Sequence, residues 1–262
     1  MVVYSVMLPL FKSHYSIGKS ILTLDCSSNK PSRGSDSIFH IAEEYNLPKV
    51  VLVEDSLTGF MEAVKSCESI NKDLVFGLRL SCFNKDLAGE DFNTEHKVIV
   101  FAKNSEGCAL LNKIYTHAFC ETGGSIAEKD LIDMWDAKNL KLAVPFYDSF
   151  IFNNLTMLGS ACSFPFLDLD PTFFIESNYL PFDNMVKQAV LSYCKSKNKN
   201  TEITKSIYYK HRSDFEAFQT YKCICGRSFS SSRTLSTPKQ DHLASSDFSF
   251  ESYLEHEQSA SN

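Results

Sequence analysis

The sequence lacks the features that mark several common classes of protein. No apolar run reaches the roughly 18–20 residues that a membrane-spanning helix needs. The apolar start, residues 1–10, has no basic region ahead of it and no small-residue cleavage site after it, so it is interpreted as a strand and not as a signal peptide. A Walker A loop, a G-x-S-x-G elbow and a dinucleotide-binding fingerprint are also missing.

An excess of basic charge is missing as well. The formal net charge is −6, so no global positive field draws the chain onto nucleic acid, and a DNA contact needs a local basic patch or a partner. Nine cysteines are scattered without a repeated spacing, and the one close pair, Cys223 and Cys225, has no second half of a zinc site. This usage is typical of reduced thiols, and we expect a cytoplasmic protein with no membrane contact.

Strand-like and helix-like segments alternate along the chain. The predicted strands are residues 2–11, 49–53, 74–80, 97–102, 140–146, 172–176 and 201–208. The predicted helices are residues 36–44, with Ser35 or Asp36 as N-cap, 57–69, 105–119, 128–135, 184–195 and 213–223. Strands separated by helices favour parallel pairing with right-handed crossovers, and about seven such units fit a closed barrel better than an open sheet.

The composition changes near residue 228. From there the chain is rich in serine and threonine and then polar and acidic, with interleaved aromatics. We expect an α/β barrel over residues 1–227 and a largely flexible tail over 228–262, with a short helix near 250–254.

Four stretches carry a resemblance to a known family. They are S-H-Y-S at 13–16, V-L-V-E-D-S-L-T-G at 51–59, H-K-V-I-V-F-A-K-N-S-E-G-C-A-L-L at 96–111, and the segment 209–226, which ends in C-I-C-G. In this order and spacing they resemble the PHP (polymerase and histidinol phosphatase) domain at the N-terminus of bacterial DNA polymerase III alpha subunits. The resemblance implies a distorted (β/α)7 barrel with two or three divalent metals at its C-terminal mouth. Such metals activate a water and clamp a phosphoester.

Most ligand positions of that family are occupied here by residues that cannot bind a metal. Its opening H-x-H falls on Leu8 and Leu10, and its next histidine falls on Lys12, which adds positive charge where a cation would sit. The remaining replacements are Leu52 and Val53 in the T-D-H motif, Arg79 for a glutamate, Ser206-Ile207-Tyr208 for D-x-H, and residues 144–147 for a Cys or His ligand.

The residual candidates for metal ligands are His14, His96, Glu54 and Asp55, where Asp55 requires a shift of one residue in the alignment. Glu176 also aligns with a family acid, although the family does not consistently use it for metal. Losing most ligands removes the charge that offsets a metal cluster, so we expect no catalytic cluster and no cofactor. The alternative is one weakly held Zn²⁺, Mn²⁺ or Mg²⁺.

The resemblance leads to three hypotheses about function. In the first, the chain is an inactive structural or interaction module in DNA replication, encoded by a phage or another reduced genome. It binds a replicative polymerase or an exonuclease subunit, and its contact with DNA is only indirect. Because the chain ends where the family's PHP domain ends, we expect no polymerase active site on it. In the second, the four residual ligands support a metal-dependent phosphoesterase, either a 3′–5′ exonuclease or a phosphatase. In the third, the barrel binds an unrelated factor.

Overall fold

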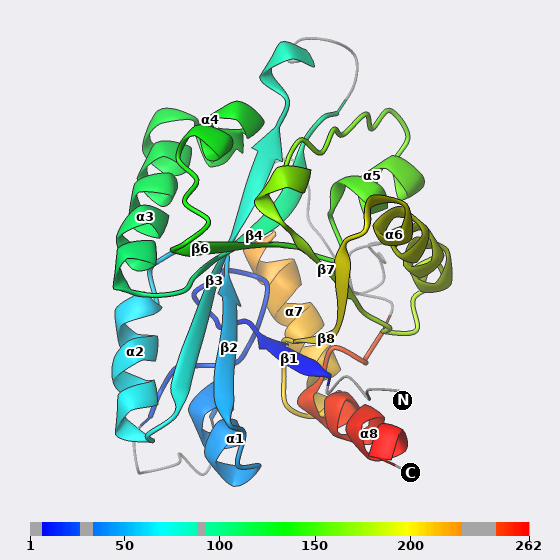
Figure 1. Ribbon diagram of the computed structural model, residues 1–262. Helices are drawn as coiled ribbons and strands as arrows, with labels where there is room; N and C mark the ends of the chain where they lie inside the picture. Colours follow the sequence, from blue (N-terminus) through cyan, green and yellow to red (C-terminus); the bar gives the residue numbers. More distant parts are fainter. Residues whose placement is uncertain (1–6, 27–33, 88–92, 227–244, 262) are drawn as a thin grey trace. The chain divides into compact units, whose positions relative to one another are not determined.

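The computed structural model describes residues 7–26, 34–87, 93–226 and 245–261 (Figure 1). The chain divides into two compact units. Unit 1 comprises residues 1–75, 177–180 and 204–262, and unit 2 comprises residues 76–176 and 181–203. Two strands, β3 (Asp73–Phe83) and β8 (Asn200–Ile207), contribute residues to both units.

Unit 1 is built on a parallel sheet with β1 (Leu8–Phe11) at its centre. This strand pairs with β2 (Lys49–Glu54) on one side and with the C-terminal half of β8 on the other. The burial of β2 is nearly continuous, as expected for a parallel strand covered on both faces. The unit also contains α1 (Ile38–Glu44), α2 (Phe60–Ser69), the short helix η4 (Arg212–Asp214), α7 (Phe215–Cys225) and α8 (Phe250–Ser261).

Unit 2 contains the mixed part of the sheet. Its strands are most of β3, then β4 (His96–Ala102), β5 (Ser125–Ala127), β6 (Leu140–Val144), β7 (Thr172–Ile175) and the start of β8. Its helices are α3 (Ser105–Thr116), α4 (Glu128–Asp133), α5 (Phe150–Thr156) and α6 (Asp183–Lys197), with the short helices η1 (Lys85–Leu87), η2 (His117–Glu121) and η3 (Leu167–Leu169). Helices α5 and α6 lie side by side in this unit (Figure 1).

The strand order confirms the predicted α/β barrel. The order is β2-β1-β8-β7-β6-β4-β3-β5, and β2 also pairs with β3. The additional pairing joins the first strand of the order to the seventh, so seven strands form a closed cycle and β5 extends from β3. Closure leaves these seven strands without an unpaired edge.

The prediction of parallel pairing throughout is wrong at β4, which runs antiparallel to both β3 and β6. Between β3 and β4, the residues that the structure describes form no crossover helix. The described part of their connection contains only the three-residue helix η1, and a connection of this kind returns the chain antiparallel. The pairings of β1 with β2, β1 with β8, β3 with β5, β6 with β7 and β7 with β8 are parallel as expected.

Helix ends show where local signals were misread. The N-cap of α1 is Ser37, whose side chain accepts a hydrogen bond from the Phe39 N–H, and neither Ser35 nor Asp36 has that role. The predicted helix at 57–69 begins only at Phe60, after a turn. Helix α5 and strand β5 were not predicted, since they have only seven and three residues and are too short to give a clear hydrophobic period.

The predicted helix at 105–119 is α3 followed by the π-helical turn η2. Asn104 caps α3 by accepting from the Gly107 N–H at 2.8 Å. A side chain at position 107 would come within 2.3 Å of the Asn139 carbonyl oxygen, so only glycine fits this part of the A-K-N-S-E-G turn.

The short helix predicted near 250–254 is present and continues to Ser261. Residues 228–244 lie outside the described part of the chain, so the flexibility predicted for the tail stays a prediction there. Within unit 1, Phe248 stacks on Tyr208 with ring centroids 5.3 Å apart, and the Phe250 N–H donates to the Tyr209 carbonyl. Residues 245–261 therefore bring buried aromatic side chains to the core of unit 1.

Among the residues that the structure describes, none of the helices combines the length and the apolar character of a membrane span.

Candidate metal site and its surroundings

Two predicted ligands, Glu54 and Asp55, lie where β1 and β2 end in unit 1. Because the strands are parallel, their carboxyl ends meet at the same edge of the sheet. Lys12, the residue after β1, extends its ammonium group to this edge and binds the Asp55 carboxylate, with 2.9 Å between Nζ and Oδ1. The Lys12 side chain is only 5% exposed, so this cation is held inside the unit.

The chain itself supplies hydrogen bonds to both oxygens of Glu54. This side chain is fully buried. Its Oε1 accepts from the Ser13 N–H at 2.7 Å, and its Oε2 accepts from the Ser16 hydroxyl. Ser16 Oγ accepts in turn from the Asp55 N–H at 2.9 Å, which leaves its own proton for Glu54. Burial raises the pKa of Glu54, while the charge of Lys12 and the serine hydrogen bonds oppose that rise.

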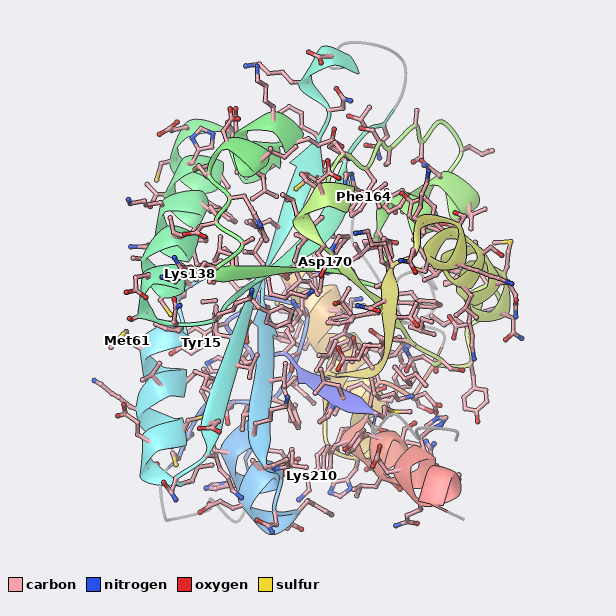
Figure 2. All side chains as sticks on the ribbon, viewed as in Figure 1. Tyr15, Met61, Lys138, Phe164, Asp170 and Lys210 are labelled. Carbon is pink, nitrogen blue, oxygen red and sulfur yellow. The ribbon has the colours of Figure 1, made fainter. Side chains whose placement is uncertain are left out.

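His14 lies in the loop between these serines. Its backbone N–H donates to the Leu22 carbonyl at 2.8 Å, and its ring lies against Tyr15 with centroids 4.4 Å apart. The Nδ1 atom of His14 is buried and has no hydrogen-bond partner. Tyr15 extends to helix α2, where its hydroxyl donates to Glu62 at 2.5 Å (Figure 2).

The fourth predicted ligand, His96, belongs to unit 2. It opens β4 and is the register partner of Cys82 on β3. Three aromatic rings surround it at centroid distances of 6.2–6.4 Å, from Phe150, Phe164 and Phe166, and Figure 2 labels the second of these. Phe164 stacks on Phe150 at 4.5 Å.

The aromatic surroundings decide the charge state of His96. The side chain is 1% exposed, its Nδ1 lies 3.5 Å from the Thr94 carbonyl oxygen, and its Nε2 has no partner. Burial lowers the pKa of His96 to about 4, so the ring is neutral at pH 7. A neutral imidazole is the form that binds a metal, but the contacts described here come from hydrocarbon rings and not from other donors.

Another replaced ligand position carries its own ion pair. In unit 2, Arg79 stands where the resemblance places a glutamate, and its guanidinium binds the Asp148 carboxylate at 2.7 Å. An arginine cannot ligate a cation, and it neutralises a neighbouring carboxylate that otherwise could. Glu176, which the resemblance aligns with an acidic residue, follows β7 and is buried in the same unit.

Sequence reasoning missed the serines and a second charged cluster. Ser13 and Ser16 were noted only as part of a motif, although they supply the donors for Glu54. In unit 1, Lys205 lies 3.8 Å from Asp247, which also pairs with Arg212 at 3.3 Å. Asp247 lies 35 residues or more beyond the two basic residues in the sequence, so no local spacing could have indicated the cluster.

The donor set does not fit a metal cluster. Across the described ranges, no group of three or more His, Cys, Asp or Glu side chains is arranged to hold a metal ion. The role of His14, His96, Glu54 and Asp55 as residual ligands stays a prediction.

Comparisons with known proteins complete the description of the site. No protein-family model matches the chain, and no curated protein matches its sequence. Among solved structures, the chain is similar to a proposed metal-dependent phosphoesterase from Bifidobacterium adolescentis ATCC 15703. The identity is 11%, the TM-score is 0.43, and the match covers 77% of this chain and 88% of the other. A likeness at this level says nothing by itself about the activity of this chain.

Proposed function

We propose that this chain is a PHP-type barrel that keeps a phosphoesterase scaffold without a catalytic metal cluster, and that it acts by binding another protein. One observation carries the proposal. The carboxylates at the ends of β1 and β2 are already bound by Lys12, Ser13 and Ser16, and no described set of three donors converges on a metal position.

The sequence resemblance supports a partner in DNA replication. The four stretches resemble a domain that the family carries in the same chain as a polymerase. A barrel of this type, in the cytoplasm, would bind a replicative polymerase or an exonuclease subunit and stabilise it. The net charge of −6 favours a protein partner over direct contact with DNA.

Two measurements test the proposal. The purified chain should hydrolyse neither single-stranded DNA nor a generic phosphate ester in Mn²⁺ or Zn²⁺. A tagged chain should co-purify with the replicative polymerase or exonuclease encoded in the same genome. Hydrolysis at an enzymatic rate would contradict the loss of catalysis, and failure to bind either protein would contradict the assignment of the partner.

A metal-dependent phosphoesterase is the second candidate. The observation that favours it is the buried, unpartnered Nδ1 of His14 in unit 1, the unit that also contains Glu54 and Asp55.

Substitution separates this candidate from an inactive barrel. If His14 ligates a metal, His14→Gln should lower both the bound metal and the hydrolysis, and an exposed histidine with no proposed role, such as His211, serves as the control. Equal metal content in wild type, His14→Gln and His211→Gln removes this candidate.

A further inference from the structure

Lys12 does more than stand where the resemblance places a metal ligand, because its side chain also carries a positive charge. The role inferred for that charge rests on the proposed function, in which the barrel has no catalytic metal cluster. We infer that the Lys12 ammonium takes the place of a cation at the carboxyl ends of β1 and β2, and that it blocks a divalent-metal site which its removal would open.

Position is the first argument. Lys12 follows β1 directly, its backbone N–H donates to the Ile207 carbonyl of β8 at 3.3 Å, and its side chain reaches past the end of β2. The strand pairing fixes the root of the side chain, because Leu8 to Phe11 pair continuously with the end of β8. The ammonium group is thus held in place and does not sample the solvent.

Charge is the second argument. Glu54 and Asp55 supply two carboxylates, and Lys12 supplies one positive charge. A divalent ion added beside Lys12 would bring three positive charges against two negative ones, next to the buried Lys12 and Glu54 side chains, where screening by water is weaker than at the surface. Without Lys12, the same ion and the two carboxylates would balance.

Hydrogen bonding is the third argument. The donors on Glu54 are a backbone N–H and a hydroxyl, and neither carries a charge. They orient the carboxylate without neutralising it, whereas Lys12 brings a positive charge to both carboxylates at the strand ends. Removing one partner of a buried ion pair leaves charge that is costly unless another cation replaces it.

The test compares Lys12→Met with a matched control. Lys210 in unit 1 also forms an ion pair at 2.9 Å, with Glu44, but lies away from the two carboxylates, so Lys210→Met reports the loss of an ordinary pair. Melting temperatures are measured for each protein with EDTA and with increasing Mn²⁺ or Zn²⁺.

We expect Lys12→Met to melt below wild type in EDTA and to recover as the Mn²⁺ concentration rises, because a ligand that binds only the folded state stabilises it. Wild type and Lys210→Met should not respond. Adding Asp55→Asn to Lys12→Met should abolish the response, since the divalent ion then lacks one of its two carboxylates.

Each other outcome has a definite meaning. A stable Lys12→Met that ignores both metals overturns this inference and leaves the proposed function intact. Stoichiometric metal on wild type overturns both. If Lys12→Met does not fold in EDTA, it is refolded with Mn²⁺; recovery only with the metal supports the inference, and no recovery with either metal overturns it.

Discussion

The ends of β1 and β2 in unit 1 and the start of β4 in unit 2 both carry predicted metal ligands, yet their surroundings differ in kind. Around Glu54 the chain places polar donors and the charge of Lys12. Around His96 it places phenylalanine rings. The first setting keeps a charged carboxylate and gives it hydrogen-bond donors and a cation from the chain itself. The second setting keeps His96 neutral, because burial disfavours the protonated ring.

This difference shows two ways in which a barrel of this type can remain stable without a metal cluster. An acid that stays buried needs replacement donors and a replacement cation, because an unpaired buried charge is costly. A histidine that stays buried needs only to remain neutral, which aromatic packing accomplishes. Substitutions can therefore test each setting separately.

The loss of side-chain volume should lower the stability of the protein more at the aromatic cluster around His96 than at the polar site around Glu54. Phe166 is fully buried and lies against both His96 and Phe164. Phe166→Ala should lower the free energy of unfolding by about 3–5 kcal/mol, the usual effect of a large cavity. Urea denaturation measures it, with the exposed Phe119→Ala as control. Equal effects of the two variants would show that the ring cluster is not a packed core.

Protonation of His96 should lower the free energy of unfolding. The pKa of His96 is lowered to about 4 in the folded state, so the unfolded chain binds the proton more readily between pH 6.5 and 4. The stability that neutral His96 contributes is complete above about pH 6.5. This contribution falls by about 3 kcal/mol as the pH is lowered from 6.5 to 4.

His96→Phe should remove this part of the pH dependence while the other titrations remain. Urea midpoints of wild type and variant between pH 7 and pH 4 measure the difference. Parallel curves for the two proteins would mean that His96 is not held neutral by the fold.

The polar setting should respond to loss of a single donor. Ser16→Ala leaves Oε2 of the buried Glu54 without its hydroxyl donor and should lower stability by about 1–3 kcal/mol. Ser259→Ala, which removes an exposed hydroxyl on α8, should change stability by no more than about 0.5 kcal/mol. Thermal denaturation of both variants measures the difference. If Ser16→Ala is as stable as wild type, Glu54 does not depend on this hydroxyl donor.

A partly exposed histidine gives the smallest effect and the opposite sign. In unit 2, His117 contacts Asp130 at 3.1 Å and Glu121 at 2.7 Å, and the hydrogen bond to Asp130 raises the pKa of His117. Its contribution is complete below the ordinary histidine pKa and is lost as the pH rises through the raised value.

Because water screens this pair, His117→Ala should change stability by less than about 1 kcal/mol. The difference from wild type should shrink from pH 5 to pH 8 in thermal melts. A difference that grows with pH would contradict the assigned pairing.

The sequence predicted the fold better than the site. Buried strands such as residues 49–53 and the capped turn before α3 could be predicted, since they depend on residues that are close in sequence. The direction of β4 could not be predicted, because it depends on the segment that connects β3 to β4 and not on the residues of the strand itself. The Lys12–Asp55 pair joins residues 43 positions apart, and the rings around His96 come from segments more than 50 residues away, so neither could be read from spacing.

The amount of metal bound by the folded wild-type chain tests the central claim most directly. The protein would be dialysed against Zn²⁺ or Mn²⁺, passed through a desalting column and measured by mass spectrometry of the metal. The structure predicts well under one ion per chain, because Lys12 and the serines already bind the carboxylates. One or more ions per chain, lost when Glu54 or His14 is replaced, would contradict it.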